Sequence, residues 1–264
     1  MSRKAFTLIE LLVVISVIAL LATTVFNSLR GARESARISN ALSFQHQIHS
    51  LLGADLVGWW NFDDSANRYG DLSGGGNTGI CTACPTLIDG VPGTRGMAVN
   101  FDGSGERLTI NNPLSQIGQT QVTISVWYRR DDISAANNWR TIIGHGTGNI
   151  HHLLIHQSSR NLGLWDGAWR DFNYNPGNDV WNHYIVIYNN GVSARLYVNG
   201  VFHNEIATSL NLFSNPIGSI GNWAGGNYWS GIIDDVRIYS RALTASEIQT
   251  LYAQTRDKYL VEEK

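Results

Sequence analysis

A continuous apolar run occupies residues 6–26, close to the start of the 264-residue chain. At 1.5 Å per residue, a helix of about 20 residues is long enough to cross the roughly 30 Å hydrocarbon core of a bilayer. One carboxylate, that of Glu10, lies inside this run. A carboxylate at membrane depth costs several kcal/mol unless it pairs or takes up a proton. The sequence therefore predicts an apolar helix in which Glu10 has a partner.

The start of this run resembles the N-terminus of type IV pilins and the related pseudopilins. The resemblance rests on residues 4–15, which read KAFTLIELLVVI. It implies that a prepilin peptidase cuts between Ala5 and Phe6 and N-methylates Phe6; Ala5 stands where the family more often has Gly. It also implies that Glu10 pairs with the Phe6 ammonium of a neighbouring subunit, which would neutralise both charges inside a helical fibre.

An ordinary secretory signal or a plain membrane anchor is the alternative interpretation. A secretory signal has an apolar region of about 7–15 residues and a small-residue cleavage site after it. Residues 19–22 contain such a site, but the apolar run is longer than a signal requires. A simple membrane anchor does not require a carboxylate at position 10. The length and the carboxylate together favour the pilin-like interpretation.

The helix is predicted to continue beyond the apolar run. Residues 28–52 contain no Pro, and apolar side chains recur there at spacings of three or four, as in an amphipathic helix that ends at Gly53. The predicted divisions are a leader (1–5), an assembly helix that spans the membrane before assembly (6–52), a globular head (53–255) and a tail (256–264).

Lys and Arg number 19 against 21 Asp and Glu, and no basic stripe indicates nucleic-acid binding.

After Gly53 the sequence is typical of an all-β domain. Residues 122–128 and 181–188 alternate apolar and polar side chains, and the chain holds 27 Gly and 9 Trp. Asn190-Gly191 and Asn199-Gly200 predict type I′ turns between consecutive strands. A capping box at residues 244–247 predicts a short C-terminal helix. The expected fold class is α+β overall: a long hydrophobic helix, an all-β head and one short closing helix.

The head resembles the laminin G-like domains of the concanavalin A-like lectins and glucanases. The resemblance covers residues 56–252 and implies a jelly-roll sandwich of two antiparallel sheets. The matching pieces are residues 58–63, 71–77, 99–103, 125–128, 196–200 and 231–239, in that order.

The sequence favours binding over catalysis. Glucanases of this fold use a Glu-x-Asp-x-x-Glu pattern on one strand, because retaining hydrolysis needs two carboxylates about 5–5.5 Å apart. Glu106, Glu205 and Glu247 are the glutamates of the predicted head, and none has an Asp two residues later. The strands expected to be central, 122–128 and 181–188, contain no carboxylate. We therefore expect no enzyme.

Calcium is the cofactor that the head is expected to bind, because calcium takes carboxylate and carbonyl oxygens on loops. The resemblance implies ligands among the aspartates of the matching pieces. Turn formation and strand capping are the alternative roles for these side chains. The histidines at 145, 151, 152 and 156 are expected at the surface and not around zinc. The predicted calcium ligands are Asp71 and Asp234 first, then Asp63 and Asp102.

The tryptophans divide into two predicted groups. Trp127, Trp181 and Trp229 match core positions of the family, whereas Trp139, Trp165 and Trp169 lie in Asn- and Asp-rich stretches and are the predicted ligand contacts. Core packing is the alternative for each of these three.

Cys81 and Cys84 are the two cysteines, and an even pair in an exported head predicts a disulfide. A thioredoxin-like redox centre would need a helix N-terminus in an α/β unit, and half a zinc site would need a second pair. The sequence lacks both contexts.

These features predict a structural subunit of a type IV pilus-like filament with a lectin-like head for adhesion. Its expected partners are identical or related pilin subunits, a prepilin peptidase, the assembly platform, the inner membrane before assembly and a glycan. The expected location is the inner membrane and then an extracellular filament. The alternatives are a pseudopilin of a secretion or DNA-uptake system, a minor tip pilin, and a membrane-anchored carbohydrate-binding protein that does not polymerise.

Overall fold

The computed structural model describes residues 8–23, 25–26, 28–29, 52–89, 96–114, 120–131, 139–223 and 226–256. The chain divides into two compact units, Met1–Leu51 and Leu52–Lys264. The predicted cleavage site between Ala5 and Phe6, the predicted helix beyond residue 29 and most of the predicted tail lie outside the described residues.

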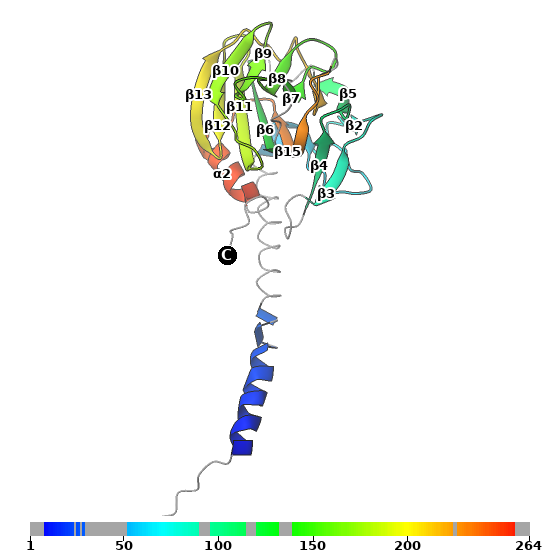
Figure 1. The fold of residues 1–264 in the computed structure, drawn as a ribbon. Helices are drawn as coiled ribbons and strands as arrows, with labels where there is room; N and C mark the ends of the chain where they lie inside the picture. Colours follow the sequence, from blue (N-terminus) through cyan, green and yellow to red (C-terminus); the bar gives the residue numbers. More distant parts are fainter. Residues whose placement is uncertain are drawn as a thin grey trace, which may run out of the picture. The chain divides into compact units, whose positions relative to one another are not determined.

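The first unit contains an α-helix over residues 8–23, drawn in blue in Figure 1. Its apolar side chains are exposed on every side, from Leu8 at 79% to Val14 at 46%. A helix that is apolar all round needs cover from lipid or from other helices. Glu10 is also exposed on this helix. Among the described residues, no helix combines the length and the apolar character that crossing a membrane requires.

The second unit is a sandwich of two antiparallel sheets (Figure 1), as the sequence predicts. Each sheet combines a run of consecutive strands with strands from distant parts of the sequence. The eight-stranded sheet has the order β13 (Val201–Ala207), β12 (Ser193–Val198), β11 (Trp181–Asn189), β6 (Gln121–Arg130), β15 (Ser230–Tyr239), β4 (Met97–Asp102) and β3 (Thr86–Asp89), and β1 (Leu56–Trp60) also pairs with β15.

The second sheet has seven strands and ends at β2, close in sequence to the edge strand β3 of the first. A 3₁₀ helix, η1 (Gly53–Asp55), precedes the sandwich, and the helix α2 (Ala245–Thr255) follows it. The order of the seven strands is β10 (Trp169–Tyr174), β9 (Leu162–Trp165), β8 (His151–Ile155), β7 (Arg140–Gly144), β14 (Ile217–Ile220), β5 (Leu108–Leu114) and β2 (Gly79–Ile80).

Among the described residues of the head, two clusters of apolar side chains form the core. The larger one contains apolar side chains of both sheets, because alternate residues of each strand face the other sheet. The smaller one contains Trp127 and Trp181 of the eight-stranded sheet, and Tyr252 of α2 packs against it. Trp229 belongs to the larger cluster. The three tryptophans predicted for the core are therefore buried, at 0%, 8% and 0% exposure for Trp127, Trp181 and Trp229.

The turn signals predict both hairpins of the β11–β13 meander, but they predict the turn type correctly only once. Asn199 and Gly200 have φ of 50° and 80° and join Val198 directly to its partner Val201, as a type I′ turn does. The other loop has three residues, because Asn189 pairs with Ser193. The type I′ prediction for Asn190-Gly191 is therefore wrong: Val192 adds one residue, and only Gly191 takes a positive φ, of 73°.

The start of the head is tied to α2 by a cluster of ion pairs that we call the Arg241 clamp. Arg241 donates from Nε to Asp55 Oδ2 at 2.7 Å and from Nη1 and Nη2 to Glu247, each at 2.8 Å. Glu247 also closes the predicted capping box with Thr244, whose N–H donates to Glu247 Oε2 at 2.7 Å. One guanidinium thus connects the chain entry at η1 with the first turn of α2.

Candidate functional site

Three tryptophans and one histidine meet on the seven-stranded sheet and form the aromatic cluster. The ring centroid of Trp139 lies 5.5 Å from that of Trp165, 5.4 Å from that of Trp169 and 4.5 Å from that of His156. Trp139 is edge-on to all three, with interplanar angles of 79°, 71° and 82°. All four side chains are partly exposed. The rings of the cluster are therefore closely packed and partly open to solvent.

Strand pairing explains why these residues meet. Trp139 directly precedes β7 and His156 directly follows β8, and the first residue of β7, Arg140, pairs with the last residue of β8. Trp165 ends β9 and pairs directly with Trp169 at the start of β10. Since β8 and β9 are neighbours in the sheet, the four rings gather from two adjacent hairpins.

The cluster lies on the face of the sheet that points away from the core. Leu162, Leu164 and Phe172 belong to the larger apolar cluster, so the alternating residues Gly163, Trp165 and Trp169 face outward. A Cβ on Gly163 would lie 2.3 Å from Trp169 Cη2 and 2.7 Å from Cζ3. The indole of Trp169 therefore covers the Gly163 backbone, and only glycine leaves room for it.

Polar side chains fix the loops around the aromatic cluster. His156 Nδ1 accepts hydrogen bonds from the backbone N–H groups of Ser158 and Ser159, at 3.3 and 3.1 Å. Asp166, in the turn between Trp165 and Trp169, accepts from Arg170 Nε at 3.0 Å and from Thr208 Oγ1 at 2.6 Å. Partial burial opposes ionisation of Asp166, but the donors outweigh it and lower its pKa. The hairpin that carries two of the tryptophans is thus held in place.

The structure brings together the three tryptophans that the sequence singles out as ligand contacts; their role in binding stays a prediction. Sequence reasoning missed His156 as a member of the cluster and Asp171 as its neighbour on the same face. The alternation of residues 169–172 around the buried Phe172 places Asp171 on the outer face, but the register with β9 cannot be read from the sequence.

Asp71, the first predicted calcium ligand, organises the loop after β1. Its Oδ1 accepts from the N–H groups of Trp59 and Ser73, both at 2.9 Å, and its Oδ2 accepts from Asn77 N at 2.9 Å and Asn77 Nδ2 at 2.8 Å. Burial acts to raise the pKa of Asp71, but the hydrogen bonds from Ser73, Asn77 and Trp59 outweigh it and the pKa lies below its usual value.

Asp63 lies on an exposed loop, and Asp102 is the exposed last residue of β4. Asp63 accepts from Met97 N at 2.8 Å and Asn61 Nδ2 at 3.0 Å. Asp102 accepts from the N–H and hydroxyl of Ser104, at 2.7 and 2.8 Å. Asp63 therefore ties its loop to the start of β4, and Asp102 stabilises the turn that follows β4.

Asp234 and Asp235 occupy an irregular point in β15, where one edge of the strand changes its partner from β4 to β1. Asp234 is fully buried, and its Oδ1 accepts from the N–H of Asp235 at 2.7 Å. Asp235 has a φ of 47° and accepts from Trp59 Nε1 at 2.8 Å and Arg237 Nε at 2.9 Å. Arg237 also lies over the Trp59 ring, 4.7 Å from its centroid. Asp235 and Arg237 thus fasten β1 to β15 through Trp59.

In the described part of the chain, no three His, Cys, Asp or Glu side chains group so that they could hold a metal ion. Calcium also accepts backbone carbonyls and water as ligands. The calcium site at Asp63, Asp71, Asp102 and Asp234 therefore stays a prediction.

Two of the four histidines expected at the surface are buried, so that expectation is wrong for His151 and His152, at 3% and 0% exposure. The reason is their place on β8, an inner strand of the seven-stranded sheet. His151 Nδ1 lies 2.7 Å from Thr141 Oγ1, and His152 Nε2 lies 2.8 Å from the Asn215 carbonyl oxygen. Burial lowers the pKa of His151 to about 4 and that of His152 to about 3.

Ser125 and His183 have the spacing of a nucleophile and its base, because Ser125 Oγ lies 2.7 Å from His183 Nε2. Both residues are buried, at 1% exposure. The imidazole is stacked with Trp127 and with Tyr252 of α2, at centroid distances of 4.9 and 6.0 Å. The pair supports the docking of α2 in a place that a substrate cannot reach.

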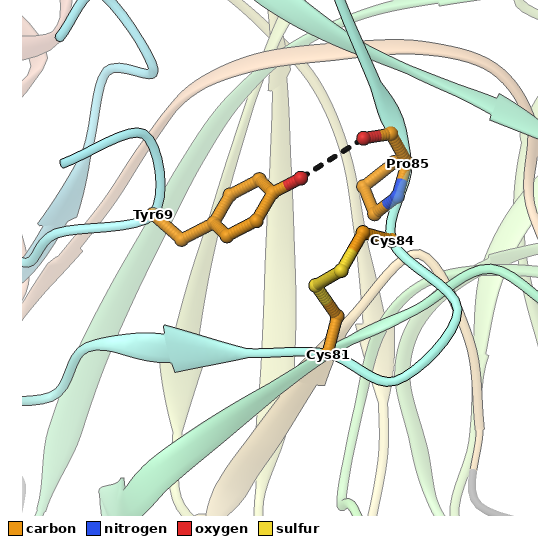
Figure 2. Close-up of a disulfide and its surroundings, with 4 residues drawn as sticks. All are labelled: Tyr69, Cys81, Cys84 and Pro85. Atoms are coloured by element: carbon orange, nitrogen blue, oxygen red, sulfur yellow. Dashed lines mark hydrogen bonds between the residues drawn. A yellow bond between two sulfur atoms is a disulfide. The ribbon is translucent and has the colours of Figure 1, made fainter. Parts of the chain in front are cut away.

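Cys81 and Cys84 form the predicted disulfide, in the short connection between β2 and β3. Figure 2 shows this turn, with the Tyr69 hydroxyl donating to the Pro85 carbonyl oxygen at 2.9 Å. Since β2 and β3 are end strands of the two different sheets, the disulfide braces a crossover between the sheets.

Two family models match the chain. Residues 1–26 match the prokaryotic N-terminal methylation motif, so the chain carries a prepilin-type N-terminus. Residues 102–249 match the concanavalin A-like lectin/glucanases superfamily. A search of the curated proteins finds no match.

Solved structures match the head. One is domain 4 of AbnA, a GH43 extracellular arabinanase from Geobacillus stearothermophilus, in complex with arabinotriose: 21% identity, TM-score 0.59, covering 75% of this chain and 98% of that chain. A second is the binding domain of Paraclostridial Mosquitocidal Protein 1, with 18% identity and a TM-score of 0.57. That match covers 76% of this chain and 52% of the other chain. A third is the ligand binding domain of Botulinum neurotoxin serotype D in complex with N-acetylneuraminic acid, with 14% identity and a TM-score of 0.52. That match covers 77% of this chain and 52% of the other chain.

At these identities the solved structures show the shared fold alone. The family model covers more than half of the chain, and the two-sheet sandwich agrees with it. The chain therefore belongs to the concanavalin A-like lectin/glucanase superfamily.

Proposed function

We propose that this chain is a structural subunit of a type IV pilus-like filament, which polymerises through its N-terminal helix and displays its head for adhesion. The observation that carries the proposal is the prepilin-type motif at residues 1–26. That motif implies processing by a prepilin peptidase and pilin-like assembly. It also indicates anchoring in the inner membrane before export.

The N-terminal helix supports this proposal through what it exposes. Apolar side chains cover all sides of residues 8–23, and burying each of them is worth about 1.5–3 kcal/mol. The inner membrane provides this burial before assembly, and the helices of neighbouring subunits provide it afterwards. Glu10 supplies the register, because its carboxylate gains an ion pair where a neighbouring Phe6 ammonium reaches it.

The head is proposed to act by binding glycans at the aromatic cluster and not by catalysis. Partly exposed tryptophans are suited to the apolar faces of sugar rings. Two proteins with the same fold have been solved with sugars, arabinotriose in one and N-acetylneuraminic acid in the other. The buried Ser125–His183 pair and the carboxylate-free strands β6 and β11 favour binding over hydrolysis.

The filament proposal is tested with Glu10→Val in the full chain, with Leu12→Val on the same helix as the matched control. We expect Glu10→Val to leave membrane insertion and cleavage intact and to abolish incorporation into filaments, whereas Leu12→Val assembles normally. Mass spectrometry of filaments sheared from cells should find this chain in abundance, beginning at N-methyl-Phe6. Normal incorporation of Glu10→Val would overturn the pairing role, and trace amounts of the chain would indicate a minor subunit.

A further inference from the structure

Asp171 lies beside the aromatic cluster and bears on the kind of glycan that the cluster accepts. We propose that the cluster binds neutral sugars and discriminates against sugars that carry a carboxylate. This inference rests on the proposed glycan-binding function and adds the class of ligand to it.

The position of Asp171 follows from strand register. Asp171 pairs directly with Gly163 across β10 and β9, and the Trp169 ring covers Gly163 on the outer face. The Cβ positions of directly opposed residues lie about 4.5–5.5 Å apart. Asp171 is also two residues from Trp169 on the same strand, so both point to the same side. The carboxylate therefore borders the indole on which a sugar would rest.

The structure holds Asp171 with neutral donors. Its Oδ1 accepts from Asn173 N at 2.6 Å and its Oδ2 from Asn161 Nδ2 at 3.1 Å. The neighbouring Arg170 is engaged with Asp166 in the hairpin turn. No ion pair among the described residues includes Asp171. Its negative charge is thus fixed in place and is not neutralised by a described cation.

This arrangement distinguishes neutral from acidic sugars. Two carboxylate oxygens offer about four acceptor positions, and two of these are used by Asn161 and Asn173, so the others are available to sugar hydroxyl groups. The indole faces receive the C–H groups of a sugar ring. A sugar carboxylate placed on the same rings would lie close to Asp171, where a partly desolvated like charge repels it more strongly than in water.

The test uses the full chain in detergent micelles, titrated with matched pairs of oligosaccharides such as lactose and sialyllactose. Within each pair we expect the acidic member to bind about tenfold more weakly or worse. Asp171→Asn should reduce this ratio to about threefold or less, whereas Asp89→Asn, which removes an exposed charge at the end of β3, should leave it unchanged. Trp169→Ala should abolish binding of both members.

The outcomes separate this inference from the function on which it rests. Absence of binding to any glycan, or binding that Trp169→Ala does not change, would overturn the proposed glycan function of the cluster. Equal binding of neutral and acidic members, or a ratio unaffected by Asp171→Asn, would overturn the ligand class alone. If Asp171→Asn does not fold by circular dichroism, the unaltered chain is titrated at low and high salt, because screening should shrink a ratio caused by charge. A ratio independent of salt would then overturn the inference.

Discussion

The imidazole of His183 is stacked on the indole of Trp127, with ring centroids 4.9 Å apart and planes inclined by 15°. Burial lowers the pKa of His183 to about 3, so the ring is neutral under physiological conditions. Tyr252 of α2 stacks on the same two rings. The attachment of α2 to the eight-stranded sheet therefore depends on a histidine that carries no charge.

Three buried histidines make the stability of the head dependent on pH. The folded pKa values of His151, His152 and His183 are about 4, 3 and 3, whereas a histidine in an unfolded chain titrates near 6.5. Between these values the unfolded state binds more protons, so the free energy of unfolding falls as the pH falls and is fully retained above 6.5. We expect a loss of roughly 1 kcal/mol per pH unit per histidine between pH 6 and 4.

Urea unfolding at a series of pH values measures this dependence. Ionised carboxylates also contribute to it, so the attribution rests on variants. His183→Gln should make the slope shallower, and His203→Gln, at an exposed position on β13, should not change it. Equal slopes for His183→Gln and the unaltered chain would contradict the prediction.

Gly163→Ala should damage both the aromatic cluster and the stability of the head. The new Cβ would lie 2.2 Å from the Arg170 carbonyl oxygen and 2.3 Å from Trp169 Cη2, so the β9–β10 pairing and the indole must both move. Overpacking of this kind costs about 1–3 kcal/mol. Gly79→Ala, whose nearest neighbour would be 3.3 Å away, is the control and should cost less. Denaturant melts followed by tryptophan fluorescence would show both effects; an unchanged midpoint for Gly163→Ala would refute the close packing.

The Cys81–Cys84 disulfide should contribute modestly to stability. It closes a loop with a sequence separation of 3, for which the chain-entropy model gives about 2 kcal/mol at most. We expect the double variant Cys81→Ser and Cys84→Ser to lower the melting temperature slightly and to keep one cooperative transition, as seen by calorimetry. Loss of folding in the variant would show instead that the crossover between β2 and β3 is a major support of the sandwich.

The calcium prediction is tested by melting the chain with added calcium and with chelator. A bound ion stabilises the folded state by RT ln(1 + [L]/Kd), which is about 2.7 kcal/mol at a hundredfold excess over Kd. We expect calcium to raise the melting temperature, and Asp71→Asn to remove the increase while Asp89→Asn keeps it. Identical melting with calcium and chelator would end the calcium proposal.

The repetitive parts of the fold could be predicted from the sequence because their signals are local. Alternation in residues 122–128 and 181–188 identifies β6 and β11, and the capping box at Thr244 identifies the start of α2. The Asn199-Gly200 pair has the conformation that its residue types favour. The same logic failed at residues 190–192, where the register of the flanking strands decides the loop length and local preference does not.

The candidate site was only partly predictable because it depends on long-range pairing. The Asn- and Asp-rich stretches around Trp139, Trp165 and Trp169 predict that these three side chains contact a ligand. Their meeting with His156 follows from the order of β7, β8 and β9 in one sheet, and no local pattern carries that order. The buried His151 and His152 were assigned wrongly for a related reason: their strand lies inside the sheet, and periodicity alone does not distinguish an inner strand from an exposed one.

The Arg241 clamp acquires a mechanical meaning if the chain works in an adhesive fibre. When the head holds a ligand and the fibre is under tension, the pulling force acts on the head through the chain at Leu52. The first strand that it reaches is β1. Among the described strands β1 pairs with β15 alone, so tension on its first residues would peel it away one hydrogen bond at a time. Arg241 forms ion pairs with Asp55, just before β1, and with Glu247 in α2. The pulling force is therefore shared with α2 before β1 separates from β15.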